Sequence, residues 1–299
     1  AEGIRECIVP GANAREGGVI PGIRVRGAEN ILEIMHFLMT RGEERDRVLP
    51  RTFVDTESLF AETERDGGGL QGRPDFAEVT GQETARRAAE IAAAGFHNLL
   101  MVGPPGAGKS MIARRIPGIL PPLTLEESLE VTSVVSVAGL LEEGEALVTG
   151  RPFRSPHHTI SQAALIGGST APKPGMISLA HRGVLFLDEL PEFQRASLDA
   201  LRQPLEERRV TISRVSGNVT YPSDFMLVCA MNPCPCGYYP DRARCSCTRP
   251  QVHRYMGKVS GPILDRIDLC VELAAVDYDS LKSRAKAESS AEIRVRVER

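Results

Sequence analysis

The sequence predicts an α/β fold in which helices cover both faces of a parallel β-sheet. Three short apolar segments, at 98–103, 183–190 and 224–232, are typical of strands buried on both faces, and helical patterns separate them. A glycine-rich loop that ends in lysine and serine joins the first of these strands to a helix. Hydrophobic residues make up 42% and charged residues 25%, which excludes a disordered chain, a collagen and a small disulfide-rich scaffold.

The length and charge of the chain limit its class further. With 299 residues it has room for one to two domains with a substantial core. Its net charge of −3 offers no overall attraction to nucleic acid or membranes, so any such binding must come from a local patch. The first residues lack the basic start and apolar core of a secretory signal, and no apolar run reaches the ~18 residues of a membrane span. We therefore expect a cytoplasmic protein without a membrane association.

The elements at the start of the chain are too few for a domain of their own. Residues 1–27 read as short strands and turns, and residues 28–40 as an amphipathic helix. The chain begins as if within a domain, so we expect residues 1–42 to be the end of one. Residues 43–74 are charged and then glycine-rich without a clear period, which predicts a linker. The apolar residues at helical spacing are Ile31, Leu32, Met35, Leu38 and Met39.

A phosphate-binding loop is the strongest motif in the chain. After a helical pattern at 84–95, the segment GPPGAGKS matches G-x-x-x-x-G-K-[ST] at every fixed position, between a strand and a helix at 111–120. Glycines let the backbone wrap closely around phosphate oxygens, Lys109 reaches the β- and γ-phosphates, and the Ser110 hydroxyl ligates Mg²⁺. The expected ATP-binding residues of this motif are Gly103, Pro104, Pro105, Gly106, Ala107, Gly108, Lys109, Ser110 and Met111.

Polar residues at the ends of the other two strands indicate an ATPase. Asp188 and Glu189 follow an apolar strand whose carboxyl end should lie beside the phosphate loop. We expect Asp188 to hold Mg²⁺ and Glu189 to act as the general base that polarises the attacking water. Asn232 ends the third strand, where the residues alone favour a turn before Pro233 over a role in positioning that water.

Together these motifs resemble the AAA+ ATPases, and longer segments between them resemble the magnesium-chelatase-like branch. The resemblance is closest to the bacterial ComM/YifB family of competence proteins, and it is strong over about 75–280. The segments that carry it are RPFRSPHHTISQAALIGG (151–168), PKPGMISLAHRGVLFLDELPEF (172–193), LRQPLEERRVTISR (201–214), AMNPCPCGYY (230–239) and SGPILDRIDL (260–269).

The resemblance implies a domain organisation. It places a P-loop AAA+ core at 75–277, preceded by the C-terminal remnant of a Lon-protease-like domain at 1–42 and the linker at 43–74. Residues 278–299 would be the start of a truncated helical lid, and the sensor 2 arginine of that lid is not visible. We therefore expect the sequence to be a fragment of a longer protein.

The resemblance also implies residue roles. Val79, Gly81 and Gln82 lie where such ATPases contact the adenine or its surroundings, and Asn232 matches sensor 1, which changes the balance in favour of its catalytic role. Arg266 matches the arginine finger, which reaches the γ-phosphate of a neighbouring subunit. A residue of that kind acts only in a ring, so the family implies a homohexamer.

A DNA partner is implied by the resemblance more than by charge. Residues 202–266 contain ten Lys or Arg and five acids, but charge alone favours a solvated surface. The ComM-like group is associated with DNA branch migration in natural transformation, and the inserts at 152–180 and 208–225 correspond to pore elements of related ring motors. We see no element that reads sequence, so we expect non-specific binding, with Arg208, Arg209 and Arg214 as candidate contacts.

Four of the seven cysteines form a candidate metal site. Cys234, Cys236, Cys245 and Cys247 have the pattern C-x-C-x₈-C-x-C, which favours a structural zinc, although the C-x-C pairs are tighter than usual zinc spacings. The alternative is four reduced thiols in a loop. His157 and His158 are adjacent, so they seldom share one ion, and we assign them to the insert. The remaining cysteines, expected in the core, are Cys7, Cys229 and Cys270.

Three functions remain open from the sequence. The first is an ATP-driven DNA-remodelling ring motor, with ATP, Mg²⁺ and a possible structural zinc as cofactors. The second is the ATPase subunit of a metal chelatase that acts on a tetrapyrrole. The third is a scaffold that uses ATP only for assembly, against which the intact Glu189 and Arg266 argue. A Lon-type peptidase needs a Ser-Lys dyad, and residues 1–42 contain no serine.

Overall fold

The chain divides into two compact units, which are described separately. The structure is a computed structural model, and it describes residues 3–65, 74–142, 144–168, 172–214, 217–275 and 287–299. Unit 1 comprises Ala1–Asp66 and Thr124–Thr149, and unit 2 comprises Gly67–Leu123 and Gly150–Arg299. None of the described helices combines the length and the apolar character that a membrane span requires.

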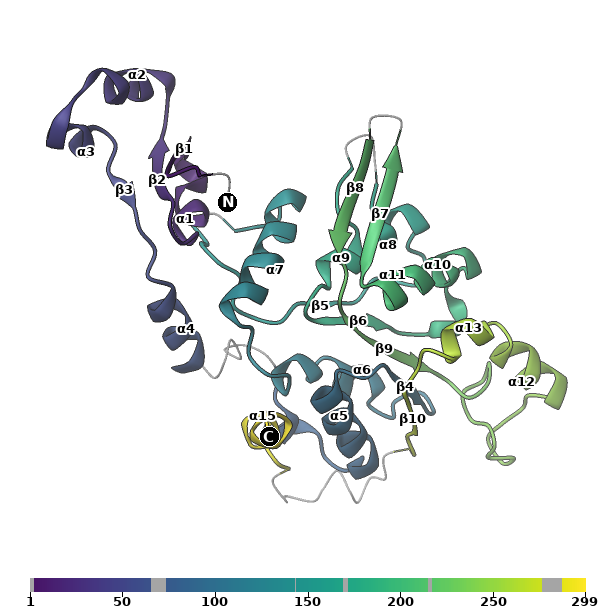
Figure 1. Ribbon diagram of the computed structural model, residues 1–299. Coiled ribbons are helices and arrows are strands. Elements are labelled where there is room, and N and C mark those ends of the chain that lie inside the picture. Colours follow the sequence, from purple (N-terminus) through teal and green to yellow (C-terminus); the bar gives the residue numbers. More distant parts are fainter. Residues whose placement is uncertain (1–2, 66–73, 143, 169–171, 215–216, 276–286) are drawn as a thin grey trace. The chain divides into compact units, whose positions relative to one another are not determined.

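Unit 1 contains a small sheet with strand order β1-β2-β3 (Figure 1). β1 and β2 pair in parallel, and β3 pairs antiparallel with β2. The strands are β1 (Glu6–Pro10), β2 (Arg24–Ala28) and β3 (Arg51–Thr52). The helices are α1 (Ala14–Gly18), α2 (Ile31–Met39), α3 (Arg45–Val48), α4 (Thr56–Arg65) and α7 (Leu125–Ala138), with 3-10 turns η1 (Gly11–Asn13) and η2 (Gly42–Glu44).

Two features of unit 1 differ from the expected organisation. The linker was expected at 43–74, but its described residues 43–65 form most of η2 together with α3, β3 and α4. The pairing of β3 with β2 is a long-range interaction that leaves no local period. The segment 124–149 lies inside the expected ATPase core, yet it belongs to unit 1. Leu125 and Leu129 pack there in one hydrophobic cluster with Val19 and Val54. The Lon-like origin of residues 1–42 stays a prediction.

A buried arginine holds unit 1 together. Arg26 is 2% exposed, and its guanidinium donates to Glu6 Oε1 at 2.9 Å, to Asp46 Oδ1 at 2.5 Å and to the Leu49 carbonyl. The hydrogen bond from Arg26 holds the pKa of Glu6 below its ordinary value. Its guanidinium also lies over the Phe37 ring, 4.7 Å from the centroid. These contacts join β1, β2, α2 and α3.

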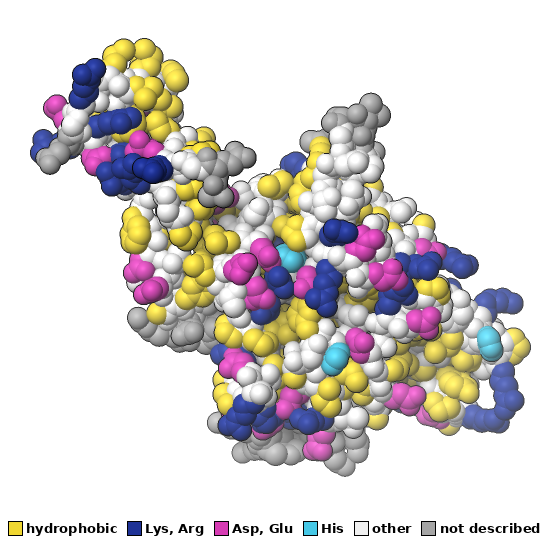
Figure 2. Space-filling view, in the orientation of Figure 1, with side chains coloured by type: hydrophobic (Ala, Val, Ile, Leu, Met, Phe, Trp, Pro, Cys, Tyr) yellow, Lys and Arg dark blue, Asp and Glu magenta, His cyan; other side chains and the backbone are white. Residues whose placement is uncertain are grey.

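The helix expected at 28–40 is confirmed as α2, but its apolar stripe is not buried. Asn30 begins the helix by accepting hydrogen bonds from the backbone N–H groups of Leu32 and Glu33. Phe37 faces the core, whereas the residues at the predicted spacing are exposed, and Figure 2 shows hydrophobic side chains gathered on this helix. Helical periodicity shows which side of a helix is apolar, but it does not show whether another segment covers that side. The exposed residues are Ile31, Leu32, Met35, Leu38 and Met39.

Unit 2 is built on a five-stranded parallel sheet with order β10-β4-β9-β6-β5 (Figure 1). Its strands are β4 (Leu99–Val102), β5 (Phe153–Arg154), β6 (Val184–Leu187), β9 (Met226–Met231) and β10 (Leu269–Glu272). Its longer helices are α5 (Glu83–Gly95), α12 (Arg249–Met256) and α15 (Ser290–Val297). The shorter ones are α6 (Lys109–Ala113), α8 (Gln162–Ile166), α9 (Met176–Leu179), α10 (Arg195–Asp199), α11 (Arg202–Glu207) and α13 (Gly261–Leu264), with turns η3 (Phe76–Glu78), η4 (Ile116–Gly118) and η5 (Leu190–Glu192).

Hydrophobic cores lie on both faces of this sheet, which confirms the predicted α/β fold. Successive side chains of a strand point to opposite faces, so Leu99 and Met101 enter one core while Leu100 enters the other. The first core includes residues of α5, α6 and α15, such as Ala89, Ile112 and Ile293. The second includes residues of α8 to α13. Strands apolar on both faces in the sequence are therefore covered on both faces in the structure.

The two inserts named from the sequence lie against each other. Residues 208–225 form a hairpin of β7 (Arg209–Arg214) and β8 (Gly217–Pro222), which pair antiparallel and project from the sheet in Figure 1. The Tyr221 hydroxyl donates to the Pro172 carbonyl at 2.6 Å, and Leu165 shares the second core with Ile212. The described residues of 152–180 therefore support the foot of the hairpin.

The prediction that three cysteines lie in the core is right for one of them. Cys229 is wholly buried in the central strand β9. Cys7 and Cys270 are exposed. They lie on β1 and β10, each an edge strand of its sheet, so the neighbouring strand covers only one side.

Candidate active site

Three neighbouring strands bring the predicted ATPase residues to one edge of the sheet. β9 lies between β4 and β6, and all three are parallel. The phosphate loop follows β4, Asn232 follows β9, and Asp188 follows β6. Because the carboxyl ends of parallel strands meet at one edge, residues far apart in the sequence lie together there.

Glycines at three positions of the phosphate loop have specific structural reasons. At Gly103 an added Cβ would lie 2.7 Å from the Leu273 carbonyl oxygen, so a side chain would push the loop away from the segment after β10. Gly106 and Gly108 have φ values of 77° and 87°, in the left-handed region that favours glycine. The loop therefore turns sharply before α6 begins at Lys109.

The side chain of Lys109 lies within this loop. It is 8% exposed, and its Nζ donates to the carbonyl oxygens of Gly103 and Pro104 at 2.6 and 2.9 Å. A third hydrogen bond, of 3.1 Å, goes to Asn232 Oδ1, so Asn232 contacts the phosphate loop directly. Burial lowers the pKa of Lys109, and the Asp188 carboxylate acts in the opposite direction.

Ser110 and Asp188 form a pair of oxygen ligands suited to Mg²⁺. The Ser110 hydroxyl donates to Asp188 Oδ2 at 2.6 Å, and Asp188 Oδ1 accepts from the Glu189 backbone N–H at 2.9 Å. A hydroxyl and a carboxylate are hard oxygen donors, and Mg²⁺ takes one or two such protein ligands beside phosphate oxygens. The residues present therefore fit this cation.

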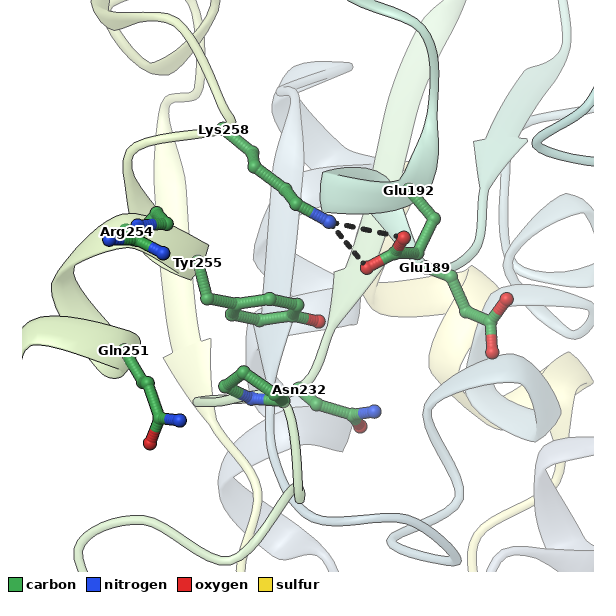
Figure 3. A pocket seen from close by; sticks show the side chains of 8 residues that line it. Glu189, Glu192, Asn232, Gln251, Arg254, Tyr255 and Lys258 are labelled. Carbon is green, nitrogen blue, oxygen red and sulfur yellow. Dashed lines mark hydrogen bonds and ion pairs between the residues drawn. The ribbon is translucent and has the colours of Figure 1, made fainter. Parts of the chain in front are cut away.

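Glu189 faces a histidine that the sequence analysis did not assign to the site. Its backbone is in the left-handed region, with φ of 53°, and its carboxylate oxygen Oε2 lies 3.1 Å from His158 Nδ1. Figure 3 shows this carboxylate turned away from the neighbouring pair of Glu192 and Lys258. His158 comes from the insert, so the insert touches the expected general base. No local pattern in the sequence indicates a contact between residues thirty-one positions apart.

A pocket of about 400 Å³ opens beside Glu189 and Asn232 (Figure 3). Lys258 Nζ forms hydrogen bonds of 3.0 and 3.1 Å with both carboxylate oxygens of Glu192 there. Burial, followed by the nearby Glu192 charge, raises the pKa of Tyr255 to about 12. The other lining residues are Pro235, Gln251 and Arg254. The sequence analysis did not identify the side of the pocket that α12 forms with Gln251, Arg254 and Tyr255.

The expected adenine-side residues hold the phosphate loop from the other side. Gln82 Nε2 donates to the Ala107 carbonyl at 3.1 Å and to the Ala274 carbonyl at 2.7 Å. Gly81 and Gln82 both have positive φ. Val79 is wholly buried in the core.

Arg266 lies near the amino end of β4, whereas the phosphate loop follows the carboxyl end of the same strand. Its backbone carbonyl accepts from Asn98 Nδ2 at 2.8 Å, and Asn98 directly precedes β4. Its guanidinium pairs with Glu206 and donates to the Pro262 carbonyl. Four residues of β4, about 13 Å of extended chain, separate it from the start of the loop.

Two of the DNA candidates, Arg208 and Arg209, lie at the foot of the hairpin, and Arg214 ends β7 at the other end of the hairpin. The cysteines lie together elsewhere. Arg208 is 3.6 Å from Asp224, and Arg209 is 3.3 Å from Glu207, so each described candidate has an acidic partner. The side chain of Arg214 lies outside the described residues. The four candidate metal ligands come together in the loop between β9 and α12: Cys234, Cys236, Cys245 and Cys247.

Comparison with known families matches this arrangement to one of them. The family described as "Magnesium chelatase, subunit ChlI" matches residues 75–281. The chain belongs to this magnesium chelatase family. The match includes the phosphate loop, the ends of β6 and β9, and Arg266.

Individual proteins that are similar to this member of the magnesium chelatase family support the resemblance to ComM and YifB. The chain is 49% identical over 98% of its length to the uncharacterised protein YifB of Salmonella typhimurium and 43% identical over 98% to the competence protein ComM of Haemophilus influenzae. It covers 55% of each, so it spans about half the length of these curated relatives. The magnesium-chelatase 38 kDa subunit of Cereibacter sphaeroides is 26% identical over 53% of the chain and 52% of that subunit. The chain is thus a magnesium-chelatase-like protein that is similar to YifB and ComM over nearly its whole length.

Proposed function

We propose that this chain hydrolyses ATP with Mg²⁺ as part of a homohexameric ring that remodels DNA without sequence preference. The observation that carries the ATPase part is the meeting of two hydrogen-bonded pairs, Lys109 with Asn232 and Ser110 with Asp188, beside Glu189. Membership of a family of AAA+ type supports ATP and Mg²⁺ as its cofactors.

Each residue of the group has a chemical task in this proposal. The ammonium of Lys109 binds phosphate oxygens in place of the loop carbonyls. Ser110 and Asp188 would hold Mg²⁺, which would supply positive charge against the phosphates. Glu189 accepts the proton of the attacking water. The Asn232 side chain, already beside Lys109, orients that water through its amide.

The position of Arg266 supports a ring. A residue about one strand length from its own phosphate loop does not reach the γ-phosphate bound there. As an arginine finger it would serve the site of a neighbouring subunit, where its charge stabilises the transition state. The pair with Glu206 then has to open when the subunits assemble.

The proposal of a DNA partner is supported by the two inserts and by the name of one relative. One relative carries the name competence protein ComM. On the face in Figure 2, Lys and Arg side chains are interspersed with Asp and Glu, so the described residues of this face form no broad basic field. The proposed contact is therefore local, at the hairpin β7–β8 and the insert packed against it.

A stimulation assay tests the proposal. The full-length protein should hydrolyse ATP, and its rate should rise when single-stranded or branched DNA is added. An ATPase rate that is unchanged by DNA and that rises when a porphyrin is added would favour the chelatase function instead. ATP-dependent assembly without any hydrolysis would favour a scaffold and would refute the ATPase assignment.

Replacing Arg209 with alanine should weaken DNA binding to a similar extent for all sequences. Arg209 is exposed at the foot of the hairpin, and each lost phosphate contact lowers the slope of log K against log salt by about one. The salt dependence of binding, measured by fluorescence anisotropy, checks this. Arg87→Ala is the matched control, because Arg87 is equally exposed and paired with an acid but lies on α5. Equal slopes for both variants would exclude the hairpin as the contact.

Replacing His158 with alanine should raise the ATPase rate measured without DNA. His158 Nδ1 lies 3.1 Å from Glu189 Oε2, so the pair competes with water for the carboxylate. A pair at this degree of exposure contributes about 0.2–1 kcal/mol, which corresponds to a rate increase of up to about fivefold. His157→Ala serves as the control, because its ring nitrogen bonds to Thr159. A lower rate in His158→Ala would mean that the histidine assists catalysis.

A further inference from the structure

The four clustered cysteines form a candidate metal site that the proposed ATPase chemistry does not use. Their ligand sulfur atoms all lie within 4.8 Å of one another. The sulfur of Cys234 is 3.3 Å from that of Cys236 and 3.8 Å from that of Cys245, and Cys236 and Cys245 are 3.5 Å apart. Two pairs separated by eight residues thus converge on one point.

We propose that these four sulfurs bind one Zn²⁺ and that the metal clamps the loop 233–248 against the phosphate loop. The assignment of the metal is independent of ATP hydrolysis, whereas the clamp rests on the nucleotide site proposed above. Tetrahedral zinc with Zn–S bonds of about 2.3 Å places its sulfurs about 3.8 Å from one another, close to the distances found. A disulfide would bring one pair to about 2.05 Å, and all four thiols are free.

The loop that carries the cysteines lacks a core of its own. It contains no helix or strand, and only Cys234 among the four is buried. The Tyr239 backbone N–H donates to Cys234 Sγ at 3.3 Å, and the Arg244 guanidinium lies 4.2 Å from the centroid of the Tyr238 ring. A short polar segment of this kind needs a crosslink to hold one conformation, and a metal supplies that energy directly.

The same loop lies directly against the phosphate loop. Gly237 has φ of 87°, and a Cβ added there would lie 2.4 Å from Cδ of Pro105. Cys234 follows Asn232 by two residues, so the cluster also anchors the strand end that contacts Lys109. A pocket of about 580 Å³ lies between Tyr238, Arg244 and the phosphate-loop residues Gly103 and Pro104. Displacement of this loop would move one wall of the nucleotide site.

Metal analysis of the purified full-length protein tests the assignment. Inductively coupled plasma mass spectrometry should find about one zinc per chain. Cys245→Ser and Cys247→Ser should lower the zinc content severalfold, whereas the control Cys270→Ser, an exposed cysteine outside the loop, should keep it. A zinc-free wild type, iron in place of zinc, or a cysteine pair found oxidised by mass spectrometry would overturn the proposal.

A second measurement does not depend on how well the serine variants fold. A mercurial reagent should release the zinc from wild-type protein, as read by a chromogenic chelator. Hydrogen exchange should then rise at 233–248 and at 103–106, because both loops lose the same support. Release of zinc with unchanged exchange at 103–106 would refute the clamp while leaving the metal site in place.

Gly237→Ala tests the contact between the loops without touching a ligand. The variant should keep its zinc and bind a fluorescent ATP analogue more weakly than wild type, because the new methyl group displaces Pro105. Gly22→Ala is the matched control, since Gly22 has a similar φ of 81° and open space around it. Equal affinities in the two variants would contradict the clamp. Failure of the wild type to bind nucleotide at all would refute the proposed function and leave the zinc measurement valid.

Discussion

Replacing Glu189 with glutamine should leave nucleotide binding intact and lower ATP hydrolysis by about 10²- to 10⁴-fold. Glutamine keeps the shape of the side chain but does not accept the proton of the attacking water. Glu189 is half-exposed at the end of β6, and its carboxylate pairs with His158 of the insert, so the fold and the affinity should be preserved. Single-turnover hydrolysis and titration with a fluorescent ATP analogue measure the two effects separately.

Glu192→Gln is the matched control for this variant. Glu192 lines the same pocket three residues later, but its carboxylate is held by Lys258. Its replacement should change the hydrolysis rate far less than Glu189→Gln does. Equal losses in both variants would mean that the pocket as a whole, and not the Glu189 base, limits the reaction.

Replacing Lys109 with methionine should weaken ATP binding by about 10- to 100-fold. A hydrogen bond from a charged donor contributes about 1.5–3 kcal/mol, and 1.4 kcal/mol corresponds to a factor of ten in affinity. Methionine retains the apolar stem, which matters because Lys109 is 8% exposed. Isothermal titration calorimetry with ATP and Mg²⁺ checks the prediction.

The control for this variant is Lys173→Met, which removes an exposed lysine of the insert. It should bind ATP as wild type does. Circular dichroism melting of Lys109→Met should show a folded protein with a lower transition temperature than wild type, since the buried Gly103 carbonyl loses its hydrogen-bond partner. An unchanged affinity in a folded Lys109→Met protein would exclude this loop as the nucleotide site.

The sheet of unit 2 was predictable from the sequence because it depends on short local signals. The strands at 99–102, 184–187 and 226–231 are apolar at every position, which occurs when both faces are covered. The boundary of unit 1 was not predictable in this way. The pairing of β3 with β2 and the packing of α7 beside Val19 depend on residues far apart in the chain.

The same distinction applies within the candidate site. Motif spacing indicates Lys109 and Asp188, because each follows a strand with a recognisable pattern, and the family resemblance implies Asn232. It does not indicate the contact of His158 with Glu189 or of Gly237 with Pro105. Those contacts join an insert and an irregular loop to the site, and neither segment has a period from which its partner can be inferred.

The sequence by itself determined the family, the phosphate-binding motif and the presence of a parallel sheet, because these depend on residue type and short spacing. Only the tertiary structure decided that Asn232 meets Lys109, that Arg266 lies near the amino end of β4, and that four cysteine sulfurs converge. The strand order brings these residues together, because β9 lies between β4 and β6. The loop after β9 then folds back onto the phosphate loop. The order of strands in a parallel sheet is set by packing between distant segments, which local sequence does not record.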